Sequence, residues 1–417
     1  MENKQDRAIL VGLELNNSSI NTEHSLIELE NLALALNIKT ISKVVQKANK
    51  IMPKYYIGSG KVLELKKQIE ILNIDIVIFD DPLSPAQIVN LENALDCQII
   101  DRSFLILSIF ASRAKSKQSV LEVALAQKQY MLPRLVGMGL TLSRQGGGTY
   151  NAKGPGETKL EMDRRRLLNE ITAIKKELVK TSKEQDIARK KRISNDIPIV
   201  ALIGYTNVGK SSIMNGLAKY LGLSEQDIVL EENMLFATLD TKTVLLKKEH
   251  QPPFLLIDTV GFVEKLPHEL VRSFESTLSD VLYADLLIHV VDGAYFNPAH
   301  INTTKNVLKS IGASHIERIM VLTKKDISYT NTHIEDDYVF VSNKTLENYD
   351  ELVNTIYGHI YKDRRLVNLK IPFNEGNIYN YFKEHTTILK TIYEDDGYLV
   401  RALLSPADLG KYKKYIL

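Results

Sequence analysis

Several features are scarce or missing, and each absence narrows the possible classes of protein. The 417 residues include a single cysteine, Cys97, and no tryptophan. One cysteine cannot form an internal disulfide, which excludes a disulfide-stapled secreted scaffold and favours a reducing compartment. No apolar run approaches the roughly 18–20 residues that a membrane-spanning helix needs. The N-terminal residues MENKQDRAIL lack the apolar core of a signal peptide, so we expect a cytoplasmic protein without a membrane span.

The charge is nearly balanced, which excludes a general electrostatic attraction to nucleic acid or to an anionic membrane. Lysine and arginine number 53 against 51 aspartate and glutamate, and the formal net charge is +2. Any attraction to a polyanion must therefore be local. Because 417 residues exceed one ordinary hydrophobic core, we expect roughly two to four domains.

Short apolar runs alternate with amphipathic segments over residues 7–110. AILVGLEL, KTISKVV, IDIVIF and CQIID are typical of strands, and the segments between them are typical of helices. Ser25 followed by Glu28 predicts a capping box at the start of the first helix. Strands that alternate with helices of this length predict an N-terminal parallel α/β domain, at residues 1–110. Cys97, at the start of a strand, is expected to be a buried structural thiol.

Residues 104–194 show no strand pattern. SVLEVALAQKQYMLPRL predicts a helix that ends at Pro133, and apolar residues then recur at spacings of mostly three and four from Leu160 to Leu178. Between these two segments lies the stretch SRQGGGTYNAKGPGETK. We therefore expect an antiparallel helical hairpin with a Gly-rich loop, at residues 111–196.

The α/β pattern returns at residues 197–360. IPIVALIG, TKTVLLKKE, PFLLID, DLLIHVVD, RIMVLTKKD and DDYVFVS predict strands, with helices such as HELVRSFESTLSDVL and HINTTKNVLKSI between them. Beyond them, LVNLKIPF and GYLVRALLS predict further strands, and one helix is expected near residues 375–385. These segments predict a second α/β domain at residues 197–360 and a small C-terminal α/β domain at residues 361–417.

The most specific motif is GYTNVGKSS, residues 204–212, which follows a strand and precedes a helix. It matches the phosphate loop G-x-x-x-x-G-K-[ST], in which glycines let backbone N–H groups surround phosphate oxygens and the helix N-terminus adds positive partial charge. Lys210 is expected to neutralise the β- and γ-phosphates, and Ser211 to ligate Mg²⁺. The motif makes residues 197–360 a predicted P-loop domain.

Two further segments predict a switch that depends on the γ-phosphate. LLIDTVG places Asp258 at the end of an apolar strand, where it would hold Mg²⁺ through water, and Gly261 where its N–H would face the γ-phosphate. FATLD, residues 236–240, lies between the phosphate loop and that strand. Thr238 in this segment can reach Mg²⁺, and Thr241 is the competing candidate.

The segment VLTKKD indicates which base is bound. Asp326 can accept hydrogen bonds from N1–H and the N2 amino group of guanine, a donor pair that adenine lacks, and Lys324 is expected over the base plane. VSNK, residues 341–344, lies where a backbone N–H can reach guanine O6. The guanine motif is usually Asn-Lys-x-Asp, and here Thr323 replaces the asparagine. Threonine cannot make both amide contacts, to the base and to the phosphate loop, so we expect guanine preference with weaker affinity.

The residue after Gly261 concerns hydrolysis. Ras-like GTPases place a glutamine there to orient the attacking water, whereas this chain has Phe262. We therefore expect slow hydrolysis by the chain alone, helped by an outside group or a bound cation. Asn207 resembles an asparagine that coordinates K⁺ in potassium-dependent GTPases, and the alternative is that it only caps a turn.

Together these motifs predict an enzyme, a P-loop GTPase that binds GTP and GDP with Mg²⁺. Lys210, Thr238 and Gly261 are expected to act in catalysis, and Ser211, Thr238 and Asp258 to hold the metal. The residues expected to bind nucleotide are Gly204, Tyr205, Thr206, Asn207, Val208, Gly209, Lys210, Ser211, Ser212, Phe236, Ala237, Thr238, Leu239, Asp240, Asp258, Thr259, Val260, Gly261, Thr323, Lys324, Lys325, Asp326, Ser342, Asn343 and Lys344.

The motif order resembles that of the translation-factor-related GTPases, and nearly the whole chain is similar to the HflX family of ribosome-associated GTPases. The strings that carry this resemblance lie outside the nucleotide motifs: YIGSGKVLELK, IVIFDDPLSPAQIVNLE, IIDRSFLILSIFASRA, LPRLVGMGLTLSRQGGG and GPGETKLEMDRRR. The resemblance implies an N-terminal α/β domain, a two-helix linker and a G domain. It also implies a tail domain that faces the ribosomal stalk base, and a factor that splits stalled or idle ribosomes under stress. We expect a monomer, cytoplasmic and partly ribosome-associated.

The resemblance places the linker near the peptidyl transferase centre of the large ribosomal subunit. Residues 153–192 carry thirteen lysines and arginines against seven acidic residues, and such an excess favours binding to RNA through counterion release. Glycines permit close backbone approach, and a tyrosine can stack on a base. The residues expected to contact RNA are Arg134, Arg144, Gly146, Gly147, Gly148, Tyr150, Lys153, Lys159, Arg164, Arg165 and Arg166.

Three alternatives remain open from the sequence. The Gly-rich stretch and its charges are also compatible with a solvated connection and an ordinary exposed helix face. The same motifs suit an assembly or storage factor for the large subunit. They also suit a nucleotide-sensing scaffold with little turnover, which Thr323 and Phe262 make conceivable.

Overall fold

The computed structural model describes most of the chain, as two compact units. The first unit comprises Met1–Ser182, Asn233–Leu239 and Lys265–Glu275, and the second comprises Lys183–Glu232, Asp240–Glu264 and Ser276–Leu417. The described residues are 5–16, 21–145, 155–193, 197–223, 241–248, 251–265, 280–327 and 337–417. Within them, only the backbone is described at 136–145, 155–160, 182–193 and 384–385.

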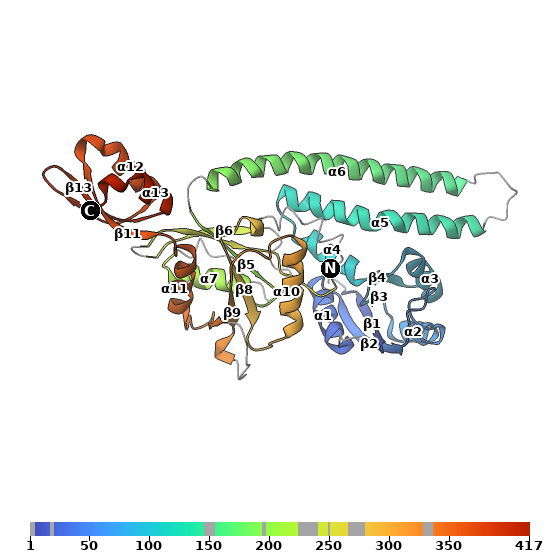
Figure 1. Cartoon of the computed structure of the whole chain (residues 1–417). Helices are drawn as coiled ribbons and strands as arrows, with labels where there is room; N and C mark the ends of the chain where they lie inside the picture. The colour runs from blue at the N-terminus through green and yellow to red at the C-terminus, as the bar shows by residue number, and fades with distance from the viewer. Residues whose placement is uncertain are drawn as a thin grey trace. The chain divides into compact units, whose positions relative to one another are not determined.

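The first unit contains a parallel sheet whose strands alternate with helices (Figure 1). The strand order is β2-β1-β3-β4, so the chain crosses over between neighbouring strands through helices, as the alternating pattern predicted. A core of aliphatic and aromatic residues, including the fully buried Ile9, Val77 and Phe79, fills the space between the sheet and its helices. The elements are β1 (Arg7–Leu15), α1 (Thr22–Ala35), β2 (Lys39–Ala48), α2 (Ser59–Leu72), β3 (Ile76–Phe79), α3 (Pro85–Leu95), β4 (Gln98–Asp101) and α4 (Arg102–Arg113).

The start of α1 corrects one prediction. The helix begins at Thr22, and the side chain of Asn21 caps it by accepting hydrogen bonds from the N–H groups of Glu23 and His24. Ser25 therefore lies inside the helix and does not cap it. Its hydroxyl, which is buried, donates instead to Asp80 at the carboxyl end of β3 (2.7 Å).

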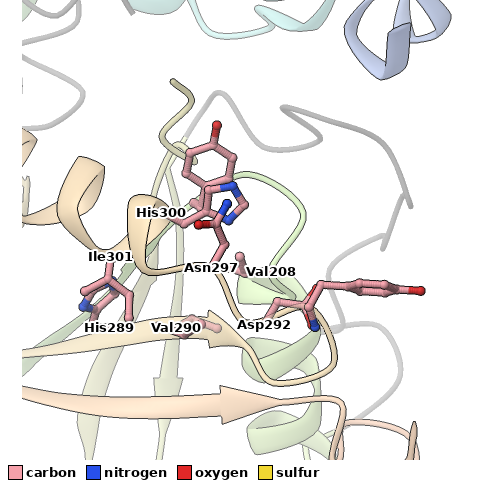
Figure 2. A pocket seen from close by; sticks show the side chains of 10 residues that line it. Val208, His289, Val290, Asp292, Asn297, His300 and Ile301 are labelled. Atoms are coloured by element: carbon pink, nitrogen blue, oxygen red, sulfur yellow. The ribbon is translucent and has the colours of Figure 1, made fainter. Parts of the chain in front are cut away.

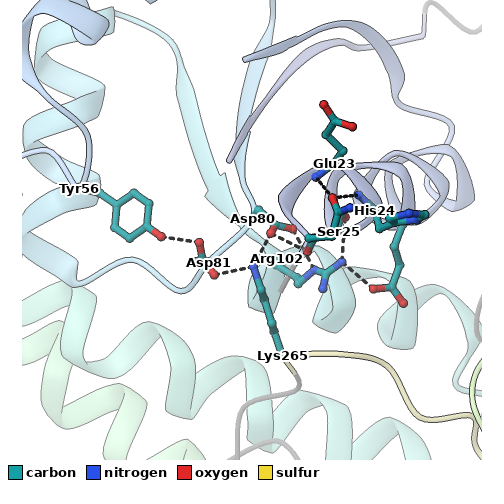
Figure 3. A network of polar contacts seen from close by, with 10 residues as sticks. Glu23, His24, Ser25, Tyr56, Asp80, Asp81, Arg102 and Lys265 are labelled. Carbon is teal, nitrogen blue, oxygen red and sulfur yellow. Dashed lines mark hydrogen bonds and ion pairs between the residues drawn. The ribbon is translucent and has the colours of Figure 1, made fainter. Parts of the chain in front are cut away.

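A network of charged groups surrounds Asp80 at this edge of the sheet (Figure 3). The Arg102 side chain is fully buried, with its guanidinium 2.8 Å from the carboxylate of Glu28 and 3.4 Å from that of Asp80. Lys265, which belongs to the same unit, pairs with Asp80 and with Asp81. Buried charges are tolerated only when they are paired in this way, so the network fixes the ends of β3 and β4 relative to α1.

Two long helices, α5 (Lys117–Gln145) and α6 (Pro155–Ile193), run antiparallel after the sheet, as the hairpin prediction required (Figure 1). Lys117 pairs with Glu177, and Lys128 pairs with Glu170. Positions that advance along α5 therefore meet positions that go back along α6, as in an antiparallel pair. Despite their length, neither of these helices, nor any other helix in the described ranges, is apolar enough over a sufficient stretch to cross a membrane.

Pro133 lies inside α5 and does not end it, which contradicts the predicted helix boundary. Proline lacks the N–H that would bond to the carbonyl one turn earlier, and its ring crowds that carbonyl. The guanidinium of the neighbouring Arg134 donates to the carbonyl of Tyr130 (2.6 Å) and lies over the Tyr130 ring. These contacts join Arg134 to the turn that precedes it, within the same helix.

The second unit contains a mixed sheet with the strand order β10-β9-β8-β5-β7-β6, in which only β6 pairs antiparallel among the described strands. All of its strands coincide with predicted runs. The predicted helix at residues 268–282 lies almost wholly outside the described residues. The elements are β5 (Ile199–Gly204), α7 (Lys210–Tyr220), β6 (Lys242–Leu246), β7 (Phe254–Asp258), β8 (Leu286–Asp292), α10 (Pro298–Ser310), β9 (Arg318–Thr323), η2 (Lys325–Ile327), β10 (Tyr338–Phe340) and α11 (Tyr349–Ile360).

The C-terminal part of this unit forms a separate antiparallel sheet with the order β11-β13-β12 (Figure 1). One face of this sheet packs against α12, with Leu369, Phe382 and Val400 fully buried between them. Strand β12 was not predicted. The elements are β11 (Arg365–Pro372), α12 (Gly376–His385), β12 (Thr387–Tyr393), β13 (Gly397–Leu404) and α13 (Pro406–Lys411). The fold class is thus confirmed, and the domain boundaries after residues 110, 196 and 360 stay predictions.

Candidate functional site

The phosphate loop connects β5 to α7 through a tight turn at the carboxyl edge of the sheet. Its backbone takes positive φ values at Gly204 (146°), Asn207 (60°) and Gly209 (92°). A Cβ atom added to Gly204 would also lie 2.3 Å from the carbonyl oxygen of Val290 on the neighbouring strand β8. Glycine is therefore required at both ends of this loop, because other residues resist these dihedrals and this close approach.

Lys210, the first residue of α7, folds its side chain back over the loop. Its Nζ donates to the carbonyl of Tyr205 (2.7 Å) and contacts that of Gly204 (3.3 Å). Burial lowers the pKa of Lys210 to about 8, although the nearby Asp258 carboxylate opposes this shift. An ammonium group held at this position is poorly solvated, so an anionic phosphate would stabilise it strongly.

Ser211 and Asp258 provide oxygen ligands of the kind that Mg²⁺ prefers. The Ser211 hydroxyl donates to the Asp258 carboxylate at 2.6 Å, and Asp258 is fully buried at the end of β7. Within the described ranges no cluster of three or more histidine, cysteine or acidic side chains could hold a metal alone. This donor set fits Mg²⁺, which is usually held by one or two protein oxygens together with phosphate oxygens and water.

The predicted switch segment, residues 236–240, lies outside the described residues. This segment includes Thr238, so its predicted role as a metal ligand stays a prediction. The competing candidate, Thr241, is described. Its hydroxyl donates to the carboxylate of Asp280 (3.2 Å). In this conformation Thr241 is therefore committed to a side chain of its own unit.

The residues after Asp258 pack directly onto the phosphate loop. The N–H of Thr206 donates to the carbonyl of Phe262 (2.7 Å), and the N–H of Phe262 donates to that of Gly204 (3.1 Å). A Cβ at Gly261 would lie 2.8 Å from Lys210 Nζ, so only glycine fits here. The Phe262 side chain is buried and apolar, and it offers no group that could orient a water molecule.

Tyr205 adds a contact that sequence reasoning missed. Its ring stacks on His300 of α10, with centroids 3.7 Å apart and planes within 7°, beside a small pocket under the loop (Figure 2). Its hydroxyl accepts a hydrogen bond from the N–H of Glu264 (2.7 Å). Burial lowers the pKa of His300 and keeps its ring neutral near neutral pH. Tyr205 thus joins the phosphate loop, α10 and the segment after Gly261.

The predicted guanine motif lies beside the phosphate loop, at the ends of β9 and β10. Thr323 is fully buried, and its hydroxyl donates to the carbonyl of Val208 in the phosphate loop (2.8 Å). Lys324 pairs with Asp292 (2.7 Å). The carboxylate of Asp326 accepts a hydrogen bond from the Ser342 hydroxyl (2.8 Å). Threonine therefore keeps the connection to the phosphate loop that we expected it to weaken.

Asn343 completes this cluster from the loop after β10. Its side-chain oxygen accepts a hydrogen bond from the Tyr349 hydroxyl (2.8 Å), and its amide nitrogen lies 3.1 Å from the position of a Cβ built on Gly209. The structure thus brings together the motifs at 204–212, 258–261, 323–326 and 342–343. Two lysines that were also predicted to bind nucleotide have other surroundings: Lys325 pairs with Glu347, and Lys344 is exposed.

Comparisons with known proteins agree with this arrangement of motifs. Three family descriptions match in succession: "GTP-binding GTPase N-terminal" at residues 23–111, "GTP-binding GTPase Middle Region" at 113–192 and "50S ribosome-binding GTPase" at 199–324. A GTPase HflX of Caldanaerobacter subterraneus is 41% identical, over 99% of this chain and 94% of the relative. The chain belongs to the HflX family of GTPases. It is a GTP-hydrolysing enzyme, and its site binds GTP and GDP.

A second relative and a solved structure are also similar to this chain. GTPase HflX of Escherichia coli K12 is 34% identical over 89% of this chain and 87% of the relative. Among solved structures, a GTP-binding protein of Sulfolobus solfataricus in complex with GDP is similar at a TM-score of 0.43 and 22% identity, over 86% of this chain and 99% of that chain.

The residues predicted to contact RNA fall into three groups. Arg134 is held within its own unit, 3.1 Å from the buried carboxylate of Asp101, with 14% of its side chain exposed. Arg164, Arg165 and Arg166 lie exposed on α6, the latter two paired with Glu161 and Glu170 on the same helix. Outside the described residues or side chains lie Arg144, Gly146, Gly147, Gly148, Tyr150, Lys153 and Lys159.

Proposed function

We propose that this HflX-family GTPase binds the large ribosomal subunit in its GTP form and splits stalled or idle ribosomes under stress. The observation that carries the proposal is the combination of a GTP site with an antiparallel helical hairpin that carries the exposed Arg164, Arg165 and Arg166. The match of residues 199–324 to a 50S ribosome-binding GTPase supports the ribosome as the partner. A ribosome-bound factor of this kind works in the cytoplasm, and we propose that it acts as a monomer.

Nucleotide binding rests on residues that the structure places at one edge of the sheet. Lys210, whose Nζ lies over the loop, would neutralise the phosphates, and the neighbouring Ser211 and Asp258 would hold Mg²⁺. The metal, when bound, would neutralise charge that develops on the phosphate oxygens during transfer. Thr238 would complete this set when the γ-phosphate is present, and Asn207, which is exposed on the phosphate loop, would contribute an oxygen ligand to K⁺.

Hydrolysis is expected to depend on the ribosome. Phe262 lies where other GTPases carry the water-orienting glutamine, and its buried apolar ring cannot replace that group. The bound ribosome, assisted by K⁺ at Asn207, would supply the group that orients the attacking water. GTP binding would thus favour the ribosome-bound form, and hydrolysis would allow release.

The hairpin would contact ribosomal RNA near the peptidyl transferase centre. The exposed guanidinium groups of Arg164, Arg165 and Arg166 can bind phosphates and release counterions. The Gly-rich stretch at residues 146–156 would approach the RNA closely, with Tyr150 stacked on a base. Arg134 is excluded from this proposal because it is occupied with Asp101. The C-terminal sheet would face the stalk base.

Sucrose-gradient sedimentation tests the splitting activity. We expect the protein with GTP to convert intact ribosomes into subunits, and the Ser211→Ala variant, which lacks the metal-binding hydroxyl, to lose this effect. If intact ribosomes persist with GTP while the protein co-sediments with subunit precursors, the assembly factor is the better reading. Ribosome-stimulated turnover measured in potassium and in sodium buffer tests the role of Asn207, whose Asn207→Ala variant should lose any potassium advantage.

A further inference from the structure

Thr323 and Asn343 meet on the same side of the phosphate loop. A Cβ built on Gly209 would lie 3.1 Å from the amide nitrogen of Asn343 and 3.6 Å from the methyl group of Thr323. The Thr323 hydroxyl is already engaged within the protein, because it donates to the carbonyl oxygen of Val208 in the loop (2.8 Å) and lies 3.3 Å from that of Val291 on β8. The side-chain amide next to the base motif therefore belongs to Asn343, from the loop after β10.

The orientation of this amide is fixed by a buried tyrosine. Tyr349 is fully buried, and its hydroxyl donates to the side-chain oxygen of Asn343 at 2.8 Å. The NH₂ group must then point away from Tyr349, toward the phosphate loop and Thr323. Within the described ranges this nitrogen makes no hydrogen bond of its own, so it is a donor held in place for a ligand acceptor.

The chemistry of guanine identifies that acceptor. The N1–H and N2 amino group of guanine are donors suited to the carboxylate of Asp326, and O6 and N7 follow as the next two acceptors around the base. The backbone N–H of Asn343 lies in the loop expected to serve O6. If that N–H donates to O6, the side-chain amide of the same residue can donate to N7, the adjacent acceptor.

We propose that the Asn343 side-chain amide donates to guanine N7 and so takes over the base contact that Thr323 cannot make. In this arrangement the two tasks of a single amide in the usual Asn-Lys-x-Asp motif are divided between two loops. Thr323 braces the phosphate loop, and Asn343 contacts the base. The proposal rests on the GTP site of the family and on no property of the ribosome.

Binding of GDP and of 7-deazaguanosine 5′-diphosphate, in which a C–H replaces N7, tests the contact. We expect the unmodified protein to bind the deaza compound about three- to tenfold more weakly than GDP, as for loss of one hydrogen bond. Asn343→Ala should bind both compounds with equal affinity. Asn343→Asp keeps an acceptor for Tyr349 but lacks the donor, so it should also fail to discriminate.

The exchange between the two positions provides a second test. Thr323→Asn combined with Asn343→Ala restores the usual motif, and this double variant should regain the preference for GDP over the deaza compound. Asn354→Ala, which removes an amide from the exposed side of α11, is the matched control and should discriminate as the unmodified protein does. Circular dichroism of each variant confirms that the sheet is intact.

Two results would overturn the proposal. The first is that Asn343→Ala still prefers GDP over the deaza compound by the full factor. That result would make Asn343 at most a support for the phosphate loop. The second is that the unmodified protein binds GDP and the deaza compound with equal affinity, which would mean that no donor contacts N7. Neither result bears on ribosome splitting, because ribosomes are absent from these measurements.

Discussion

The buried ammonium group of Lys210 should make nucleotide binding fall as the pH rises above neutrality. Burial lowers the pKa of Lys210 to about 8, with Nζ within hydrogen-bond distance of two backbone carbonyls and near Asp258. A nucleotide binds the protonated form, because its phosphates are anionic. The protonated fraction of a group with this pKa falls from about nine-tenths at pH 7 to about one-tenth at pH 9. The affinity for GDP should therefore fall about tenfold, or ~1.4 kcal/mol, across this interval.

Fluorescence titration of a labelled GDP in excess Mg²⁺ measures this loss. The control is Lys210→Arg, because a guanidinium stays charged throughout the interval and any titration of the nucleotide itself affects both proteins alike. Isothermal calorimetry near pH 8 in two buffers of different ionisation enthalpy should show uptake of about half a proton on binding. A wild-type affinity that stays flat from pH 7 to 9, or that falls in parallel with the arginine variant, would refute the reasoning.

The same shift has a calculable sign for stability. The folded pKa of about 8 lies below the unfolded value of 10.5, so the unfolded chain holds the proton between these two values and the folded chain has released it. The free energy of unfolding of the nucleotide-free protein should therefore rise as the pH increases through this window. Below pH 8 both states are protonated, and the buried ammonium opposes folding by its full amount.

Three further predictions concern other parts of the chain. Gly261→Ala places a methyl group 2.8 Å from Lys210 Nζ and 2.9 Å from the Thr206 Cα, so GTP turnover, measured by phosphate release, should fall at least about tenfold and the melting temperature should also fall. Arg102→Ala removes a guanidinium from Asp80, which keeps Lys265 and Ser25, so thermal unfolding should show a loss below the roughly 3–5 kcal/mol of an uncompensated buried charge. Replacing the exposed arginines 164–166 by glutamine should weaken ribosome pelleting and reduce its salt dependence by about 0.7–0.9 per lost phosphate contact.

The regular elements were predictable because their patterns are local. The alternation of apolar runs with amphipathic segments located the strands of the parallel first sheet and of the mixed second sheet, since each run lies within one element. Two predicted helix ends, the start of α1 and the end of α5, were wrong. Asn21 caps α1 in place of Ser25, which is drawn to Asp80 on another element. Pro133 lies inside α5, because a proline weakens a helix without always ending it.

The contacts of the site were predictable only in part, because several of them join residues that are distant in the chain. The phosphate loop and the base motif carry recognisable spacings, so Lys210 and Asp326 could be assigned from the sequence alone. No spacing relates Tyr205 to His300, whose rings stack across 95 residues of chain. Such a pair is visible only when β5 and α10 lie side by side in the folded unit.

Thr323 illustrates how the folded site changes the meaning of a substitution. Considered as one residue, threonine for asparagine removes an amide and predicts a weaker site. In the structure its hydroxyl still donates to the carbonyl of Val208, so the loop keeps its brace without the amide. The shorter side chain also leaves room next to Gly209, and the amide of Asn343 lies there. The affinity for guanine nucleotides should therefore depend on residues 323 and 343 as a pair, and a change at either position alone should cost more than the paired exchange.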